Sequence, residues 1–163
     1  MKKHLYAFVW CLCATFTGWA QPQYSLPHGL YNQDVLEIGI TPMNNDTEVR
    51  YTTDGSIPTP NSLLYTAPLI LKETTLLRAV EVKDGELMSP VTTASYIFME
   101  SVMNQSNTPE GYPTEWGKYT DMAGRAIADY EMDPEMTNDK VLRPKIMEGL
   151  YDLPILSIVT NKD

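Results

Sequence analysis

Cysteine is almost absent from this 163-residue sequence, occurring only at Cys11 and Cys13. Histidine is equally rare, occurring at His4 and His28. A structural zinc site takes its ligands largely from these two residue types, and a disulfide framework needs cysteines spread along the chain. The sequence therefore predicts no zinc site and a fold that is stabilised by packing without disulfides.

Basic residues are also scarce. The chain has 12 Lys and Arg against 21 Asp and Glu, so its formal net charge is −9 at pH 7. An acidic surface repels a phosphate backbone, and no basic stripe is present that could follow one. We therefore expect no nucleic-acid partner.

The first 20 residues have the pattern of a targeting segment. A short basic start precedes the apolar run "LYAFVWCLCATFTGW", and small residues follow at Gly18 and Ala20. This pattern predicts a signal peptide over residues 1–20, cleavage before Gln21 and export from the cell. No later run approaches the roughly 20 apolar residues of a membrane span, so we expect no transmembrane segment after cleavage.

Residues 24–99 have the pattern of an all-β domain. Short runs rich in β-branched and aromatic residues alternate with turn residues, which is typical of a small antiparallel sandwich. The run "LLRAVEVKDG" is apolar on both faces, which indicates a central strand. The predicted fold class is mainly β: an immunoglobulin-like sandwich of about seven strands. Alternation places three sets of residues on one face of their strands: Leu36, Ile38 and Ile40; Val49, Tyr51 and Thr53; and Ala94, Tyr96 and Phe98.

The stretch "RYTTDGSIPTPNSLLY" raises the question of a catalytic carboxylate at Asp54. Glycosidic chemistry needs two carboxylates across a cleft, and the stretch supplies no evident second one. Asp-Gly between alternating runs is instead a strong hairpin signal, because Gly55 tolerates positive φ. We predict a structural turn formed by Asp54, Gly55 and Pro58, and no catalytic residue.

Other chemistry finds little support in the sequence. If residues 1–20 are removed, His28 is the single histidine left, and it lies in a predicted loop beside Pro27. A nucleophile activated by histidine is therefore not expected. No glycine-rich phosphate loop is present, so no cofactor is predicted. Asp129, Glu131 and Asp133 follow the spacing of a calcium loop, but Pro134 replaces the required glycine of an EF-hand and Lys140 its required glutamate. An irregular calcium site remains an alternative to a solvated acidic connector.

The composition changes after Met99. Residues 100–132 are polar and rich in Gly and Pro, which predicts a connector with a short helical turn around residues 122–128. Asp133 followed by Pro134 predicts a helix start. Pro144 is expected to interrupt that helix, which restarts over "PKIMEGLYD" with Ile146 and Leu150 four residues apart. The run "PILSIVT" predicts a buried strand with no partner in this sequence.

Several motifs of the β domain resemble a known family. They are a strand ending in Tyr51 to Ser56, the Pro58-Thr59 step, Tyr65 before Pro68, and a strand at Leu77 to Ala79. Over about residues 30–98 the chain resembles the chitobiase/β-hexosaminidase C-terminal-type domain, also described as the Fn3-associated module of secreted bacterial proteins. One departure is Glu81, where a small apolar residue is expected. A buried carboxylate is costly, so Glu81 must lie at the sheet margin or be paired.

The C-terminal third resembles a second family. "GYPTEWG", "DYEMDPEMTND" and "LPILSIVT" are similar to the segment that leads into the spore-coat protein H (CotH) kinase-like domain of exported bacterial proteins. The expected organisation is a signal peptide over 1–20, the module over 24–99, a connector over 100–132 and the start of a truncated kinase-like domain over 133–163. The resemblance implies that any phosphoryl-transfer residues lie beyond Asp163.

Three aromatic residues of the connector are candidate contacts, either for a ligand or between domains: Tyr112, Trp116 and Tyr119. The predicted function is that of an exported, non-catalytic accessory module that spaces, presents or docks a downstream domain. The alternatives are a carbohydrate-binding module of the bacterial cell surface and the N-terminal part of a kinase-like protein. Expected partners are that downstream domain and a cell-surface glycan, with the chain itself a monomer.

Overall fold

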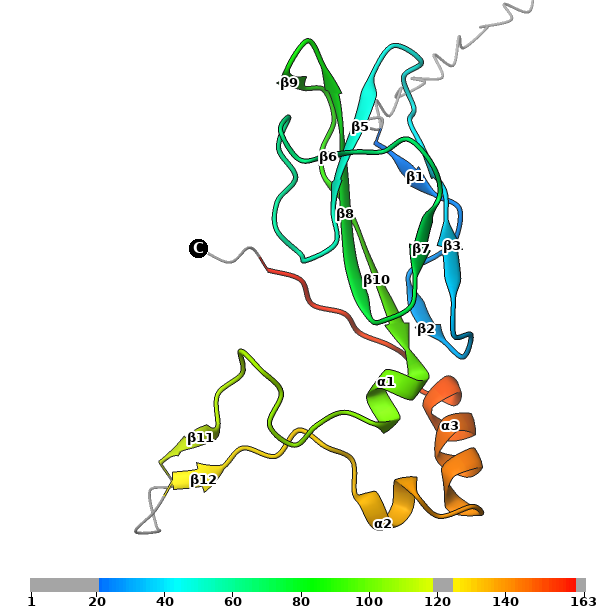
Figure 1. Ribbon diagram of the computed structural model, residues 1–163, viewed down its shortest axis with the longest axis vertical. Helices are drawn as coiled ribbons and strands as arrows, with labels where there is room; N and C mark the ends of the chain where they lie inside the picture. The colour runs from blue at the N-terminus through cyan, green and yellow to red at the C-terminus, as the bar shows by residue number, and fades with distance from the viewer. Residues whose placement is uncertain (1–20, 119–124, 161–163) are drawn as a thin grey trace, which may run out of the picture.

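The computed structural model describes residues 21–118 and 125–160, and the predicted signal peptide and Tyr119 lie outside these ranges. Strands dominate up to Phe98, and three helices follow (Figure 1). The elements are β1 Gln23–Tyr24, β2 Gly29–Tyr31, β3 Leu36–Ile38, β4 Ile40–Thr41, β5 Glu48–Thr52, β6 Leu63–Leu64, β7 Leu69–Leu71, β8 Thr75–Lys83, β9 Glu86–Leu87, β10 Thr92–Phe98, α1 Met99–Met103, β11 Glu115–Lys118, β12 Arg125–Ile127, α2 Pro134–Thr137 and α3 Leu142–Asp152.

The strands up to β10 form a small β-sandwich, as predicted. One layer is the sheet β2-β10-β8-β5-β6, with β9 paired to β8. The ladders β3-β7 and β1-β4 face it as the second layer (Figure 1). Every pair in the sandwich is antiparallel except β2 with β10, which is parallel.

The strands are more numerous and shorter than the predicted seven, because single runs change partners. The run "VLEIGIT" divides at Gly39 into β3, which pairs with β7, and β4, which pairs with β1. Ser25 N donates to Gly39 O at 2.9 Å, and Gly39 N donates to Ser25 Oγ at 2.8 Å. Gly39 therefore marks the point at which the chain passes from one ladder to the other.

The central position of β8 confirms the interpretation of its two apolar faces. β8 pairs with β10 on one side and with β5 on the other. Leu77 and Ala79 on one face and Val80 on the other are all fully buried. A strand covered on both faces loses most of its water contact, which is why its sequence is nearly continuous in apolar residues.

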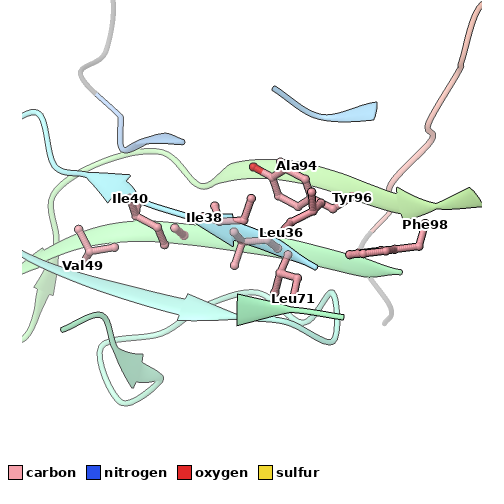
Figure 2. Close-up of a cluster of buried hydrophobic side chains, with 10 residues drawn as sticks. Leu36, Ile38, Ile40, Val49, Leu71, Ala94, Tyr96 and Phe98 are labelled. Carbon is pink, nitrogen blue, oxygen red and sulfur yellow. The ribbon is translucent and has the colours of Figure 1, made fainter. Parts of the chain in front are cut away.

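The core lies between the two layers (Figure 2). Side chains of β3 and β7 meet those of β8 and β10 there. Of the three residues that alternation placed on one face around β5, Val49 is buried and Tyr51 partly buried, but Thr53 is exposed because it lies after the end of the strand. Tyr96 is fully buried, and its hydroxyl donates to Leu26 O at 2.9 Å. Burial raises the pKa of Tyr96 far above its usual range, so this phenol remains a neutral hydrogen-bond donor.

Glu81 is a fully buried carboxylate on the same face of β8 as Leu77 and Ala79. It is paired, as the sequence analysis required. Its Oε1 accepts from Met43 N at 2.7 Å, and its Oε2 accepts from Asn44 N at 3.3 Å, Asn44 Nδ2 at 2.6 Å and Thr47 Oγ1 at 2.9 Å. Burial raises the pKa of Glu81, but these hydrogen bonds outweigh it and the net pKa is lowered. The ionised side chain holds the loop between β4 and β5 against the sheet.

The connector contains a hairpin where a helical turn was expected. Residues 125–127 form β12, which pairs with β11, so the predicted turn around 122–128 is wrong over these residues. The gap between β11 and β12 lies outside the described residues. Extended pairing lets Ala128 N donate to Thr114 O at 2.9 Å, and the Ala128 side chain becomes buried.

Two helices form, as expected, but the break between them lies before Pro144 rather than at it. Asp133 caps α2, with Oδ1 accepting from Glu135 N at 2.9 Å, and Pro134 is the first helical residue. Pro144 does not interrupt a helix, because it is the third residue of α3. Amides in the first turn of a helix have no intrahelical acceptor, so a proline there removes no bond.

Residues 154–160 run extended along the sandwich but form no assigned strand. The expectation of a buried strand is wrong, since Leu156 is 84% exposed and Ile158 is 78% exposed. Ser157 Oγ lies 2.7 Å from Ser95 Oγ of β10. Every residue of this segment is exposed except Val159, which is half-buried.

Among the described residues, none of the helices has the length and apolar character that would let it span a membrane.

Candidate functional site

The corner after β5 is the first candidate, because it contains Asp54, Gly55 and Pro58. Asp54 Oδ1 accepts from Ser56 Oγ at 2.6 Å and from Ser56 N at 3.0 Å. These bonds lower the pKa of Asp54, and they make the carboxylate part of a local turn. Pro58 is buried. The hydrogen bonds of the Asp54 carboxylate stabilise the backbone of the turn, and none of them joins it to a second carboxylate.

Gly55 lets this corner approach β8. Its φ is +80°, a conformation that glycine adopts without strain. A Cβ built on Gly55 would lie 2.7 Å from Leu76 Cδ2. Arg78 Nη1 donates to Gly55 O at 3.0 Å. The corner is therefore joined to the central strand, and the ten residues between β5 and β6 form a long connection rather than the tight hairpin that Asp-Gly favours.

Residues 129–133 are the second candidate, as the remnant of a calcium-loop pattern. Asp129 Oδ1 accepts from Glu131 N at 3.2 Å, and Asp133 Oδ1 caps α2. No group of three or more His, Cys, Asp or Glu side chains within residues 21–118 and 125–160 is arranged to hold a metal ion. These carboxylates instead form turns and a helix cap.

The third candidate is an aromatic cluster on the β11-β12 hairpin. The ring centroids of Trp116 and Tyr130 are 4.9 Å apart, and those of Tyr112 and Tyr130 are 5.5 Å apart. Trp116 is 53% exposed and Tyr112 is 62% exposed. The structure thus brings two of the three predicted aromatic residues together, and Tyr119 lies outside the described residues.

Tyr130 joins the cluster but was missed by the sequence analysis. Its hydroxyl donates to Pro113 O at 3.0 Å, and its backbone bonds Asn107 and Gln105. Tyr130 lies in "DYEMDPEMTNDK", where the acidic spacing drew attention to the carboxylates instead. Only the pairing of β11 with β12 reveals that the ring lies beside Trp116.

A further hollow lies where residues 155–159 meet the sandwich. Its lining includes His28, Thr93 and Ser95 on one side and Ile155, Ser157 and Val159 on the other. His28 is exposed there, as expected of a loop histidine. Among the described residues that line the hollow there is no carboxylate that could orient the imidazole for nucleophilic chemistry.

Comparison with known proteins finds a similarity over part of the chain. Residues 38–96 match the protein-family model described as Fn3 associated. The match begins in β3 and ends in β10, so it spans the sandwich core and supports the Fn3-associated resemblance of that segment. It does not extend to residues 97–163 or to their resemblance to a kinase-like domain. No curated protein and no solved structure matches the chain.

Proposed function

We propose that the chain is an exported, non-catalytic accessory module whose sandwich spaces or presents a neighbouring domain. The observation that carries the proposal is the Fn3-associated match over residues 38–96 of the sandwich. Two acidic residues within this segment have structural roles. Asp54 closes a turn and Glu81 anchors a loop. Export is supported by the basic start and apolar run of residues 1–20.

The apolar segment 153–160 supports a docking role. Leu153, Leu156 and Ile158 each expose more than half of their side chain. Exposed apolar side chains on an extended segment suit pairing with the sheet of a neighbouring domain. The resemblance of "LPILSIVT" to the start of a kinase-like domain suggests that neighbour, whose phosphoryl-transfer residues would lie outside this sequence.

Activity assays test the non-catalytic part of this proposal. The full chain is incubated with chitooligosaccharides and, separately, with ATP and a protein substrate. We expect no hydrolysis and no phosphate transfer above the level of the Asp54→Asn variant. An activity of the wild-type chain that disappears in Asp54→Asn, with an unchanged melting temperature, would contradict the proposal.

Mass spectrometry of the exported protein tests its export. We expect an N-terminus at Gln21 or its cyclised form, because Gly18 and Ala20 occupy the positions that the processing enzyme recognises. An exported protein that still begins at Met1 would show that residues 1–20 are not a cleaved signal.

A further inference from the structure

The aromatic cluster of Tyr112, Trp116 and Tyr130 is held in place before any ligand arrives. Tyr130 is tied to Pro113 through its hydroxyl and to Asn107 through its amide. Gln105 Nε2 donates to Tyr130 O at 2.9 Å. With its side chain and backbone fixed, Tyr130 contacts the rings of both Tyr112 and Trp116. A preorganised surface of this kind loses little conformational entropy on binding.

The rings of Tyr112 and Trp116 are both inclined to the ring of Tyr130. Trp116 is tilted by 50° to Tyr130, and Tyr112 by 64°. Both outer rings are more than half exposed, although aromatic side chains usually bury most of their surface. The hairpin projects away from the sandwich (Figure 1). The rings therefore face solvent rather than the described core.

The size of the cluster favours a small, flat ligand over a protein. One aromatic side chain has a surface of about 150–250 Å². With Tyr112 and Trp116 more than half exposed, the exposed surface of the three side chains together is on the order of 300 Å². A stable protein partner needs about 800 Å² on each side. One or two sugar rings match the smaller area, because a pyranose presents a flat face of C–H groups that packs on an aromatic ring.

The charge of the chain favours a neutral ligand. The net charge of −9 opposes phosphorylated or sulfated polymers. Glu110 and Glu131 are exposed, two positions before Tyr112 and one after Tyr130. Ionised carboxylates accept hydrogen bonds and can receive them from sugar hydroxyls. Aromatic faces with a few polar acceptors are the usual composition of a ligand site.

We infer that Tyr112, Trp116 and Tyr130 form a binding site for a neutral polysaccharide of pyranose sugars. The inference rests on the proposed accessory function and gives it a ligand class. The outer rings of Tyr112 and Trp116 contact the sugar, while Tyr130 positions them. The module would then hold its neighbouring domain beside a glycan.

Affinity electrophoresis of the full chain tests the site. The protein is run through gels that contain hydroxyethylcellulose, glycol chitin or xylan. We expect retardation of the wild-type chain in at least one gel. Trp116→Ala and Tyr112→Ala should each bind the polymer roughly tenfold more weakly, because each loses one ring contact of about 1.4 kcal/mol. Tyr151→Ala, which removes a half-exposed aromatic residue of α3, is the matched control and should bind normally.

Two further measurements keep the test independent of folding. Melting temperatures of the variants should equal that of the wild type. Titration of the unmodified chain with the retarding polymer should shift its tryptophan fluorescence, and this shift should be absent in Trp116→Phe, which keeps only Trp10 and Trp19. Retardation should also persist at about 1 M salt, where charge interactions are screened. Migration unaffected by all three polymers, or equal loss of binding in Tyr151→Ala, would overturn the inference while leaving the activity and export tests of the accessory function unchanged.

Discussion

At the scale of single residues, Gly55 and Gly85 provide a matched pair. Both have φ near +80°, but a Cβ meets Leu76 only at Gly55 and meets nothing within 4 Å at Gly85. Substitution by alanine should cost each position about 1 kcal/mol for the left-handed backbone. We expect Gly55→Ala to cost more than Gly85→Ala in urea unfolding. Equal losses at the two positions would show that Leu76 moves aside freely.

Glu81 makes a second residue-scale prediction. Its folded-state pKa lies below the ordinary value of 4.5, so the ionised form stabilises the fold above that pH, and this contribution is lost as pH falls through the lowered pKa. Glu81→Gln places an amide donor against donors of the loop and should cost about 1–3 kcal/mol at pH 7. Urea unfolding at several pH values should show the gap between wild type and variant closing in acid.

A control for Glu81 is available on β3. Glu37 is exposed, and Glu37→Gln should change the unfolding free energy by less than about 0.5 kcal/mol. A Glu81→Gln variant as stable as Glu37→Gln at pH 7 would contradict the anchoring role of the carboxylate.

At the scale of elements, α3 depends on its N-terminal turn because none of its residues is buried. Asp139 Oδ1 accepts from Leu142 N at 2.8 Å and from Val141 N at 2.7 Å, and these bonds lower the pKa of Asp139. Asp139→Ala should cost the helix about 1 kcal/mol, whereas Asp139→Asn should keep most of the cap. Backbone chemical shifts of residues 142–152 report the helix population. Equal populations in the two variants would show that the cap is not needed.

At the scale of the whole molecule, stability is concentrated in the sandwich. Amides of Val49 to Thr52 and of Leu76 to Val82 should exchange slowly, because β5 and β8 pair inside the larger sheet. Those of Ile155 to Thr160 should exchange quickly, because the segment joins no assigned ladder. Amide hydrogen exchange measured by NMR compares the protection of these two groups of residues. Strong protection of residues 155–160 would show that the tail pairs with the sandwich.

The sequence by itself determined the features that depend on local patterns, such as the buried faces of strands and the start of a helix. The buried faces of β3, β5 and β10 follow from period-two patterns, and the central place of β8 follows from its apolar residues on both faces. The α2 cap follows from Asp133 and Pro134, whose preferences act within one turn. The need of Glu81 for a partner follows from the cost of burying a charge.

Only the tertiary structure decided which distant segments meet. The division of residues 36–41 into β3 and β4 at Gly39 depends on where β1 and β7 lie. The partner of Glu81 is a loop some 35 residues away in the sequence, and nothing in the sequence of that loop predicts the contact. Tyr130 joins Trp116 only because β11 pairs with β12, and short-range propensity wrongly favoured a helix there. Residues 154–160 are apolar but exposed, because an apolar segment is buried only where another part of the structure packs against it.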